Sequence, residues 1–180
     1  MTAGLYLIKG PWPGRLAIVA RPRGGDWLED EVRSWARSGL KVIVSLLTPQ
    51  ETAEFDLTNQ EALCRSNGIE FVSFPIPDRG VPSSGGETLR LVKALEGHLA
   101  TGTNVGIHCR QGIGRSGLAS ACLLVSSGLS PDVAFNQLSE ARGRPVPETT
   151  EQREWVEAFT PQLVTGKSRL ERPRGKSKAV

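Results

Sequence analysis

The chain of 180 residues has few cysteines and no long apolar stretch. Leu118–Val125, its most apolar run, is far shorter than the roughly 18 residues that span a bilayer. Residues 1–10 lack the apolar length and the small-residue cleavage site of a secretory signal peptide. Three cysteines are too few for the disulfide framework of a small secreted domain: Cys64, Cys109 and Cys122. We therefore expect a cytoplasmic protein without a membrane span.

The composition also excludes a chain that is disordered over most of its length. Apolar residues make up 38% and charged residues 23%, and the 20 glycines and 12 prolines indicate many turns. A length of 180 residues fits one domain. Because no internal repeat or linker divides the first 160 residues, we predict a single domain over residues 1–160.

The net charge of +3 comes from the end of the chain. From Pro161 onward only Glu171 opposes six basic residues, which are Lys167, Arg169, Arg172, Arg174, Lys176 and Lys178. We predict that residues 161–180 form a disordered basic tail, which could contact anionic surfaces. No zinc-finger spacing, RNP-like aromatic motif or heptad repeat accompanies it, so we expect no nucleic-acid partner.

Strand and helix patterns alternate along the predicted domain. Short apolar runs predict strands at 5–8, 16–20, 42–47, 69–74 and 104–108. Amphipathic or apolar stretches predict helices at 27–38, 87–100, 116–127, 131–143 and 150–159, with two more that begin at Thr48 and Thr58. This order predicts an α/β fold with a central, mostly parallel sheet of about five strands flanked by helices.

Three helix starts have the pattern of a capping box, in which a polar residue is followed three positions later by glutamate. The pairs are Asp26 with Glu29, Thr48 with Glu51, and Thr58 with Glu61. Pro49 strengthens the second start, since proline is favoured at the first helical position. The carboxylates around it are expected on the helix surface: Glu51, Glu54 and Asp56.

Residues 108–117 read His-Cys-Arg-Gln-Gly-Ile-Gly-Arg-Ser-Gly and lie between a predicted strand and a predicted helix. Gly112, Gly114 and Gly117 fit the spacing of a dinucleotide-binding loop. That interpretation is weak, because helices rather than another strand–helix unit follow. No acidic residue closes a strand about 20 positions further on, where a ribose would need it.

A second interpretation depends on Cys109 and Arg115. A loop that enters a helix N-terminus presents backbone N–H groups and a positive dipole to an anion, and glycines let it curve tightly. Arg115 can hold two phosphate oxygens at once. The same positive field is expected to lower the pKa of Cys109, so that its thiolate can attack a bound phosphate.

The sequence His108-Cys109-(five residues)-Arg115-Ser116 resembles the signature loop of the cysteine-dependent protein tyrosine phosphatase superfamily. The resemblance implies that Cys109 is the nucleophile and that Ser116 helps the thiolate to leave. His108 is expected to be a structural histidine that orients the loop, rather than an acid or a base. The residues implied to bind the substrate phosphate are Arg110, Gln111, Gly112, Ile113, Gly114 and Arg115.

Asp78 is the candidate general acid and base for such a reaction. It lies in a long loop rich in proline and glycine, residues 75–86, between a predicted strand and a predicted helix. The segment Pro-Ile-Pro-Asp-Arg-Gly-Val-Pro resembles the general-acid loop of small dual-specificity-type phosphatases. One carboxyl group can protonate the leaving oxygen and later accept a proton from water. A plain turn-forming aspartate is the alternative.

Five further residues have two open interpretations each. Gln152 resembles the residue that positions the hydrolytic water in some family members, and could equally be an ordinary helix-start residue. Arg79 and Arg110 either border the pocket or are simply exposed. Cys64 and Cys122 are expected to be buried small residues, with reversible disulfide protection of Cys109 as the alternative.

The resemblance favours a small dual-specificity or kinase-associated-phosphatase-like enzyme that needs no metal and no cofactor. Tyr6 is the one tyrosine in the chain, and the Lys-Asn-Arg-Tyr stretch of the larger tyrosine-specific enzymes is absent. We therefore expect a protein phosphatase for phosphotyrosine and possible activity on phosphoserine and phosphothreonine. A phosphatase for an inositol phosphate, lipid or RNA 5′-phosphate and a non-catalytic phospho-binding module are the alternatives.

Overall fold

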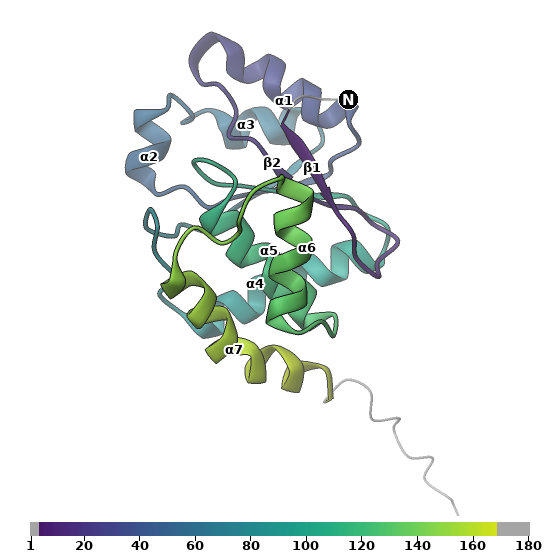
Figure 1. Ribbon diagram of the computed structural model, residues 1–180. Helices are drawn as coiled ribbons and strands as arrows, with labels where there is room; N and C mark the ends of the chain where they lie inside the picture. The colour runs from purple at the N-terminus through teal and green to yellow at the C-terminus, as the bar shows by residue number, and fades with distance from the viewer. Residues whose placement is uncertain (1–3, 169–180) are drawn as a thin grey trace, which may run out of the picture.

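Five short strands form one sheet in the computed structural model, which describes residues 4–168 (Figure 1). In sheet order, the strands are β1 (Leu5–Ile8), β2 (Leu16–Val19), β5 (Val105–His108), β3 (Val42–Ser45) and β4 (Glu70–Ser73). The helices are α1 (Leu28–Arg37), α2 (Pro49–Glu54), α3 (Gln60–Ser66), α4 (Gly85–Ala100), α5 (Gly114–Ser126), α6 (Pro131–Arg142) and α7 (Thr150–Ser168). A short 3₁₀ turn, η1 (Gly25–Trp27), precedes α1.

The sheet is mostly parallel, which confirms the predicted fold class. Strand β1 runs antiparallel to β2, and the β2–β5, β5–β3 and β3–β4 pairs are parallel. All residues of β2, β3 and β5 are buried, as expected for central strands covered on both faces. The carboxyl ends of the parallel strands therefore meet at one edge, and β5 brings the signature loop, residues 109–115, to the middle of that edge.

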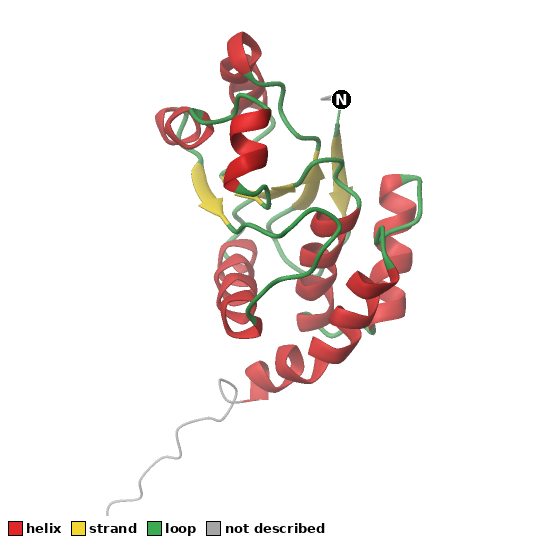
Figure 2. Ribbon diagram, turned by 90° about the vertical axis from the view of Figure 1, so that its left-hand side faces the viewer, coloured by secondary structure: helices red, strands yellow, loops and turns green. Residues whose placement is uncertain are grey.

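Helices cover both faces of the sheet (Figure 2). Alternate residues of a strand point to opposite faces, and accordingly Ala17 packs with α1 and α3 whereas Ile18 packs with α4 and α5. Cys109 belongs to the same apolar core as α5, and Cys64 belongs to the core on the other face. Within residues 4–168 no helix is both long and apolar enough to cross a membrane.

Helix α5 fixes the signature loop in place because all 13 of its residues are buried. It contacts β2 and β5 as well as α4, α6 and α7. The run of small and apolar residues after Arg115 suits a helix surrounded on all sides, since such a helix needs no polar face. The amino end of α5, and the loop that leads into it, are therefore held rigidly against the sheet edge.

Two of the three predicted capping boxes are wrong. Asp26 lies inside η1, and α1 starts after Trp27 without a side-chain cap. Likewise α3 starts after Asn59 rather than at Thr58, again without a side-chain cap. Only the box of Thr48 and Glu51 forms. Polar spacing by itself does not decide a helix start, because the approach of the preceding chain sets which residue takes the cap position.

Three helices extend beyond their predicted ends. Helix α4 starts at Gly85, capped by the Ser84 hydroxyl, rather than at Glu87. Helix α5 starts at Gly114 rather than Ser116. Helix α7 continues through Pro161 to Ser168, not to Phe159. Because Leu163 is buried in the core, its packing offsets the cost of an internal proline. The prediction of a disordered tail is therefore wrong for residues 161–168, and residues 169–180 lie outside the described residues.

Candidate active site

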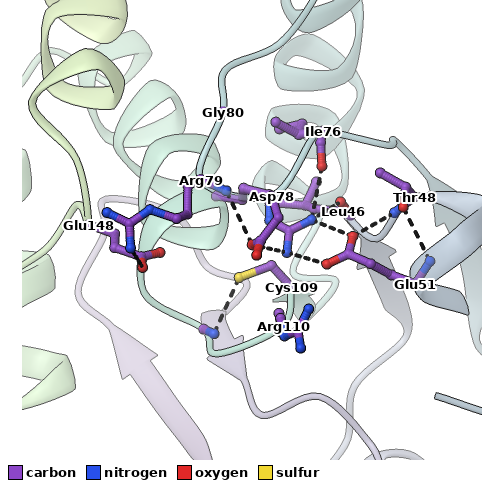
Figure 3. Close-up of polar contacts among 12 residues, drawn as sticks. Leu46, Thr48, Glu51, Ile76, Asp78, Arg79, Gly80, Cys109, Arg110 and Glu148 are labelled. Atoms are coloured by element: carbon purple, nitrogen blue, oxygen red, sulfur yellow. Dashed lines mark hydrogen bonds and ion pairs between the residues drawn. The ribbon is translucent and has the colours of Figure 1, made fainter. Parts of the chain in front are cut away.

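The signature loop curves around the sulfur of Cys109 directly after β5. Gly112 N–H donates a hydrogen bond to Cys109 Sγ over 3.3 Å (Figure 3). Gly112 has φ of +67°, a conformation that favours glycine, and this turn aims its amide at the sulfur. Cys109 itself is 3% exposed. The loop thus brings a sulfur atom and a backbone donor together at the amino end of α5.

Arg115 is buried and densely bonded, with 2% of its side chain exposed. Its terminal nitrogens donate to Glu51 Oε2 and Oε1 over 2.7 and 2.8 Å, and to Asp78 Oδ1 over 2.8 Å. They also donate to the carbonyl oxygens of Leu46 (3.3 Å) and Ile76 (2.9 Å). Burial alone would lower the pKa of Arg115, but its hydrogen bonds to Glu51 and the nearby charges of Cys109, Glu51 and Asp78 raise it. The guanidinium group is a fixed positive charge.

Glu51 is a site residue that sequence reasoning missed. The expectation of a surface position is wrong, because Glu51 is 6% exposed and holds Arg115 through both carboxylate oxygens. It also accepts a hydrogen bond from Thr48 N–H over 3.0 Å, as part of the capping box of α2. Burial would raise the pKa of Glu51, but the hydrogen bonds from Arg115 and Thr48 lower it overall. A buried arginine needs a carboxylate partner. This requirement was the one available indication that a glutamate such as Glu51 belongs to the site.

Asp78 lies at the mouth of the site, on the acid loop (residues 74–84) between β4 and α4. Its side chain is 46% exposed, and its Oδ1 contacts both Arg115 and the backbone N–H of Arg79. A cavity of about 20 Å³ is lined by Asp78, Cys109, Arg110, Gln111, Gly114, Arg115 and Glu148. The structure thus brings the predicted nucleophile, the predicted acid and four of the six predicted phosphate-binding residues into one cavity, and Gly112 and Ile113 are not among its lining residues. The cavity is small because Asp78 closes over Arg115.

Gln152 is fully buried and holds the acid loop against the start of α7. Its Nε2 donates to the carbonyl oxygen of Gly80 over 3.1 Å, and its Oε1 accepts from the N–H groups of Glu148 and Thr149. A Cβ atom on Gly114 would lie 2.8 Å from this side chain, so the glycine allows Gln152 to approach the signature loop. Gln152 is therefore more than an ordinary helix-start residue, since it joins the acid loop to the start of α7 and packs closely against Gly114 at the amino end of α5.

Arg79 and Arg110 differ in their relation to this cavity. Arg79 pairs with Glu148 over 3.1 Å and does not line the cavity itself. Arg110 lines it and contacts Glu54 loosely, over 3.6 Å. Of the two arginines, only Arg110 is thus in a position to contact a molecule that enters the site.

His108 lies beneath the signature loop, completely buried. Its Nε2 is 2.9 Å from the side-chain nitrogen of Gln60, and its ring packs against Trp35 with centroids 5.9 Å apart. Burial lowers the pKa of His108 to about 4, an effect that the backbone of Cys109 opposes and the charges of Arg21 and Arg115 reinforce. His108 is therefore neutral at pH 7, in line with the expected structural position. Gln60 was not predicted.

Arg142 supports the signature loop from outside. Its guanidinium group donates to the carbonyl oxygens of Gly112 over 2.6 Å and Gln111 over 3.2 Å, and it lies 3.7 Å from the ring centroid of Tyr6. With these carbonyl groups held outward, the neighbouring N–H groups are free to face the cavity. Sequence reasoning missed Arg142 because it lies at the end of α6, far from the loop in the chain.

The remaining predicted residues, Ser116, Cys64 and Cys122, have no hydrogen bond to the sulfur of Cys109 in the part of the chain that the structure describes. Ser116 is fully buried, and its hydroxyl has no hydrogen-bond partner among residues 4–168. Burial raises the pKa of Cys64 and of Cys122 to about 12. Cys64 lies across the sheet from Cys109, and Cys122 lies about 12 Å along α5 from its start. Neither thiol is placed for a disulfide with Cys109.

This combination of fold and loop defines a cysteine-based phosphatase of the tyrosine and dual-specificity class. A family model described as "Swiss Army Knife protein, DSP-PTPase phosphatase domain" matches residues 11–167. The chain therefore belongs to the dual-specificity and protein tyrosine phosphatase family. The interpretation of the three glycines as part of a dinucleotide-binding loop is wrong, since the strand β5 and the helix α5 flank the signature loop of a phosphatase.

Curated relatives agree with this assignment. The chain is 29% identical over 138 residues to cyclin-dependent kinase inhibitor 3 of Rattus norvegicus, a match that covers 76% of the chain and 65% of the relative. It is 31% identical over 136 residues to the Mus musculus protein of the same name, covering 74% and 62%. The match thus spans a little under two thirds of these relatives.

Solved structures share the fold. A kinase associated phosphatase whose catalytic site cysteine is replaced by serine superposes with a TM-score of 0.79 at 22% identity, covering 91% of this chain and 98% of that one. Tk-PTP in its active form gives a TM-score of 0.75 at 29% identity, covering 90% and 99%. At 22% identity, the likeness to the kinase associated phosphatase supports the fold alone.

Proposed function

We propose that this protein is a phosphatase that hydrolyses phosphotyrosine, and also phosphoserine or phosphothreonine, in phosphorylated proteins. The observation that supports this most directly is the convergence of Cys109, Arg115 and Asp78 on one cavity at the carboxyl edge of the sheet. A nucleophile, a fixed cation and a carboxyl group are the three groups that hydrolysis of a phosphate monoester through a covalent intermediate requires.

In the first step, the Cys109 thiolate attacks phosphorus and the bond from phosphorus to the ester oxygen breaks. Arg115 and the loop amides balance the charge on the phosphoryl oxygens, as in other phosphoryl transfers. Asp78 gives its proton to the leaving oxygen, so that an alcohol or phenol departs. A cysteinyl-phosphate remains.

In the second step, water attacks the phosphorus of the cysteinyl-phosphate while the Asp78 carboxylate takes a proton from it. The bond from sulfur to phosphorus breaks, and the electron pair returns to Cys109 as a thiolate. The Ser116 hydroxyl has no partner among the described residues and is available to donate to the departing sulfur. Gln152, which holds the acid loop at Gly80, positions Asp78 for both transfers.

The substrate proposal depends on the shape of the site. Tyr6 lies against Arg142 on the outer side of the signature loop, so it does not form a wall beside Asp78. Without a deep tyrosine-lined slot, the site does not demand the length of phosphotyrosine, and shorter phosphorylated side chains also reach Cys109. The arginines of the signature loop are its only cations, with no lysine between Cys109 and Ser116.

The test is hydrolysis of para-nitrophenyl phosphate in the presence of EDTA by the wild type and by Cys109→Ser, with and without vanadate. We expect turnover that resists EDTA, is inhibited by vanadate and disappears in the folded variant. A folded wild type that binds phosphopeptides without hydrolysing any phosphate ester would indicate a binding module. Hydrolysis of inositol or RNA phosphates in preference to phosphopeptides would indicate a non-protein substrate.

A further inference from the structure

A second group of cations lies beside the signature loop, on the loop after β2. This loop is fixed against the end of α2: Gly25 N–H donates to the carbonyl oxygen of Asp56 over 3.2 Å. A Cβ atom on Gly24 would lie 1.8 Å from the carbonyl oxygen of Phe55, so only glycine allows this approach. The loop that carries Arg21 is thus held at Gly24 and Gly25 by close backbone contact with the residues that follow α2.

Arg21 and Arg110 contact the same aromatic side chain. The guanidinium carbon of Arg21 lies 3.9 Å from the ring centroid of Phe55, and that of Arg110 lies 5.0 Å from it. Both distances are within the range of cation–π contacts. Arg110 also lines the cavity of Cys109. The two arginines, with Phe55, therefore form a surface that continues directly from the candidate active site.

This surface has more positive charge than its own carboxylates balance. Among residues 4–168, Glu54 is the one carboxylate that pairs with Arg110, over a loose 3.6 Å and with 55% of its side chain exposed. Arg21 forms no ion pair with any carboxylate of residues 4–168. Its guanidinium group has one long hydrogen bond, 3.5 Å to the carbonyl oxygen of Pro22, and its Nε is buried without a partner.

The unpaired charge of Arg21 has a physical cost in the free protein. Two like charges at one ring repel each other, and a buried N–H group without an acceptor loses its hydration. An anion placed between the two guanidinium groups would offset the repulsion between them. Arg23, two residues further along the same loop, needs no such ligand because it pairs with Glu31 over 2.6 Å.

We propose that Arg21, Phe55 and Arg110 form a second anion-binding subsite, which recognises an acidic group next to the phosphorylated residue of a peptide substrate. The inference rests on the proposed phosphatase function and adds a substrate preference to it. The acidic group is a carboxylate or a second phosphate, since either can accept hydrogen bonds from guanidinium groups. We refer to these three residues as the Arg21 subsite.

The test compares matched phosphotyrosine peptides that differ at the residues next to the phosphotyrosine. One peptide has glutamine there, the second has glutamate and the third has phosphoserine, and each pattern is made on both the amino and the carboxyl side. The kcat/KM of each peptide is measured with the wild type, Arg21→Gln, Arg21→Lys and Arg23→Gln. Thermal unfolding shows whether each variant is folded, and para-nitrophenyl phosphate reports its remaining activity.

We expect the wild type to prefer an acidic peptide over its glutamine counterpart by about tenfold, the size of one charge-assisted hydrogen bond. Arg21→Gln should remove most of this preference and Arg21→Lys should keep part of it, whereas Arg23→Gln should leave the ratio unchanged. The preference should also fall with rising ionic strength. The ratio of kcat/KM between an acidic peptide and its glutamine counterpart also identifies the ligand. Equal ratios for the phosphoserine and glutamate peptides would show that a carboxylate is sufficient for recognition, and a larger ratio for the phosphoserine peptide would show that the subsite prefers a second phosphate.

Two results would overturn the inference while the phosphatase proposal stands. One is turnover of all peptides at equal kcat/KM by the wild type, and the other is the same loss of preference in Arg21→Gln and Arg23→Gln. If no variant and no wild type hydrolysed any phosphate ester, the proposed function itself would fail.

Discussion

Replacing Glu51 by glutamine should strongly destabilise the protein, although the two side chains have the same shape. Glu51→Gln removes the negative charge that faces Arg115, and its amide nitrogen cannot accept the hydrogen bond that one of the two carboxylate oxygens accepts from the guanidinium group. The side chain of Glu51 is 8% exposed and that of Arg115 is 2% exposed. Water cannot replace the lost partner at that depth, so the variant leaves a buried positive charge whose remaining carboxylate partner is Asp78.

The expected loss follows from the burial of this pair. Removal of one partner from a buried ion pair typically costs about 3–5 kcal/mol. Asp78 remains 2.8 Å from Arg115, and therefore we expect the lower end, about 3 kcal/mol. For a protein of this size each kcal/mol lowers Tm by about 2–4 °C. The Tm of Glu51→Gln should accordingly fall by about 6–12 °C at pH 7.

The pH dependence supplies an independent check. The folded-state pKa of Glu51 is lowered from 4.5, so its contribution is fully present above pH 4.5 and is lost as the pH falls through the lower folded-state value. The difference in Tm between wild type and Glu51→Gln should therefore shrink below pH 4.5.

The measurement is thermal unfolding by circular dichroism, with Glu61→Gln as the matched control. Glu61 pairs with Arg65 at the surface, with 51% of its side chain exposed, and such pairs contribute about 0–1 kcal/mol. If Glu51→Gln melted within about 1 °C of the control at pH 7, the buried pair would not contribute as its geometry implies.

Two further predictions concern Asp78 and His108. Asp78→Asn should lower kcat by about 10²–10⁴-fold on phenyl phosphate, a poor leaving group, because the amide cannot donate the proton; near-normal kcat would remove Asp78 as the acid. The pKa of His108 is lowered to about 4 by burial, so wild-type stability should fall as the pH drops from 6.5 toward 4, by up to about 3 kcal/mol. His108→Asn should reduce this dependence in denaturant titrations, and an unchanged slope would show that His108 is not its source.

The central part of the site could be predicted because it is local in sequence. Cys109 and Arg115 lie on one loop between a strand and a helix, and the chemistry of each follows from its residue type and spacing. Asp78 could be singled out only together with that loop, because an aspartate between proline and glycine is by itself typical of a turn, and the structure places it in the same cavity as Cys109. The sheet could be predicted from short apolar runs, since the strands are buried on both faces and need no alternation.

The residues that support the site could not be predicted in the same way. Glu51, Gln60 and Arg142 each contact it from a separate helix. Their residue types suit an exposed helix surface equally well, and only the packing of the helices decides which of them are buried. The extension of α7 past its predicted end could not be predicted for the same reason. Pro161 and the basic residues after it indicate locally that the helix ends, whereas the burial of Leu163 depends on how α7 packs on the core.

The contact between Asp78 and Arg115 bears on how a substrate enters. A bidentate phosphate needs two N–H groups of Arg115, but both terminal nitrogens already donate to Glu51, Asp78 and backbone carbonyl oxygens. The cavity of about 20 Å³ has room for a water molecule rather than a phosphate. Of the two carboxylates, Asp78 is exposed and on a loop, whereas Glu51 is buried in a helix. On the proposed mechanism we therefore expect a bound phosphate to displace Asp78 from Arg115, and the same movement would free Asp78 to reach the leaving oxygen.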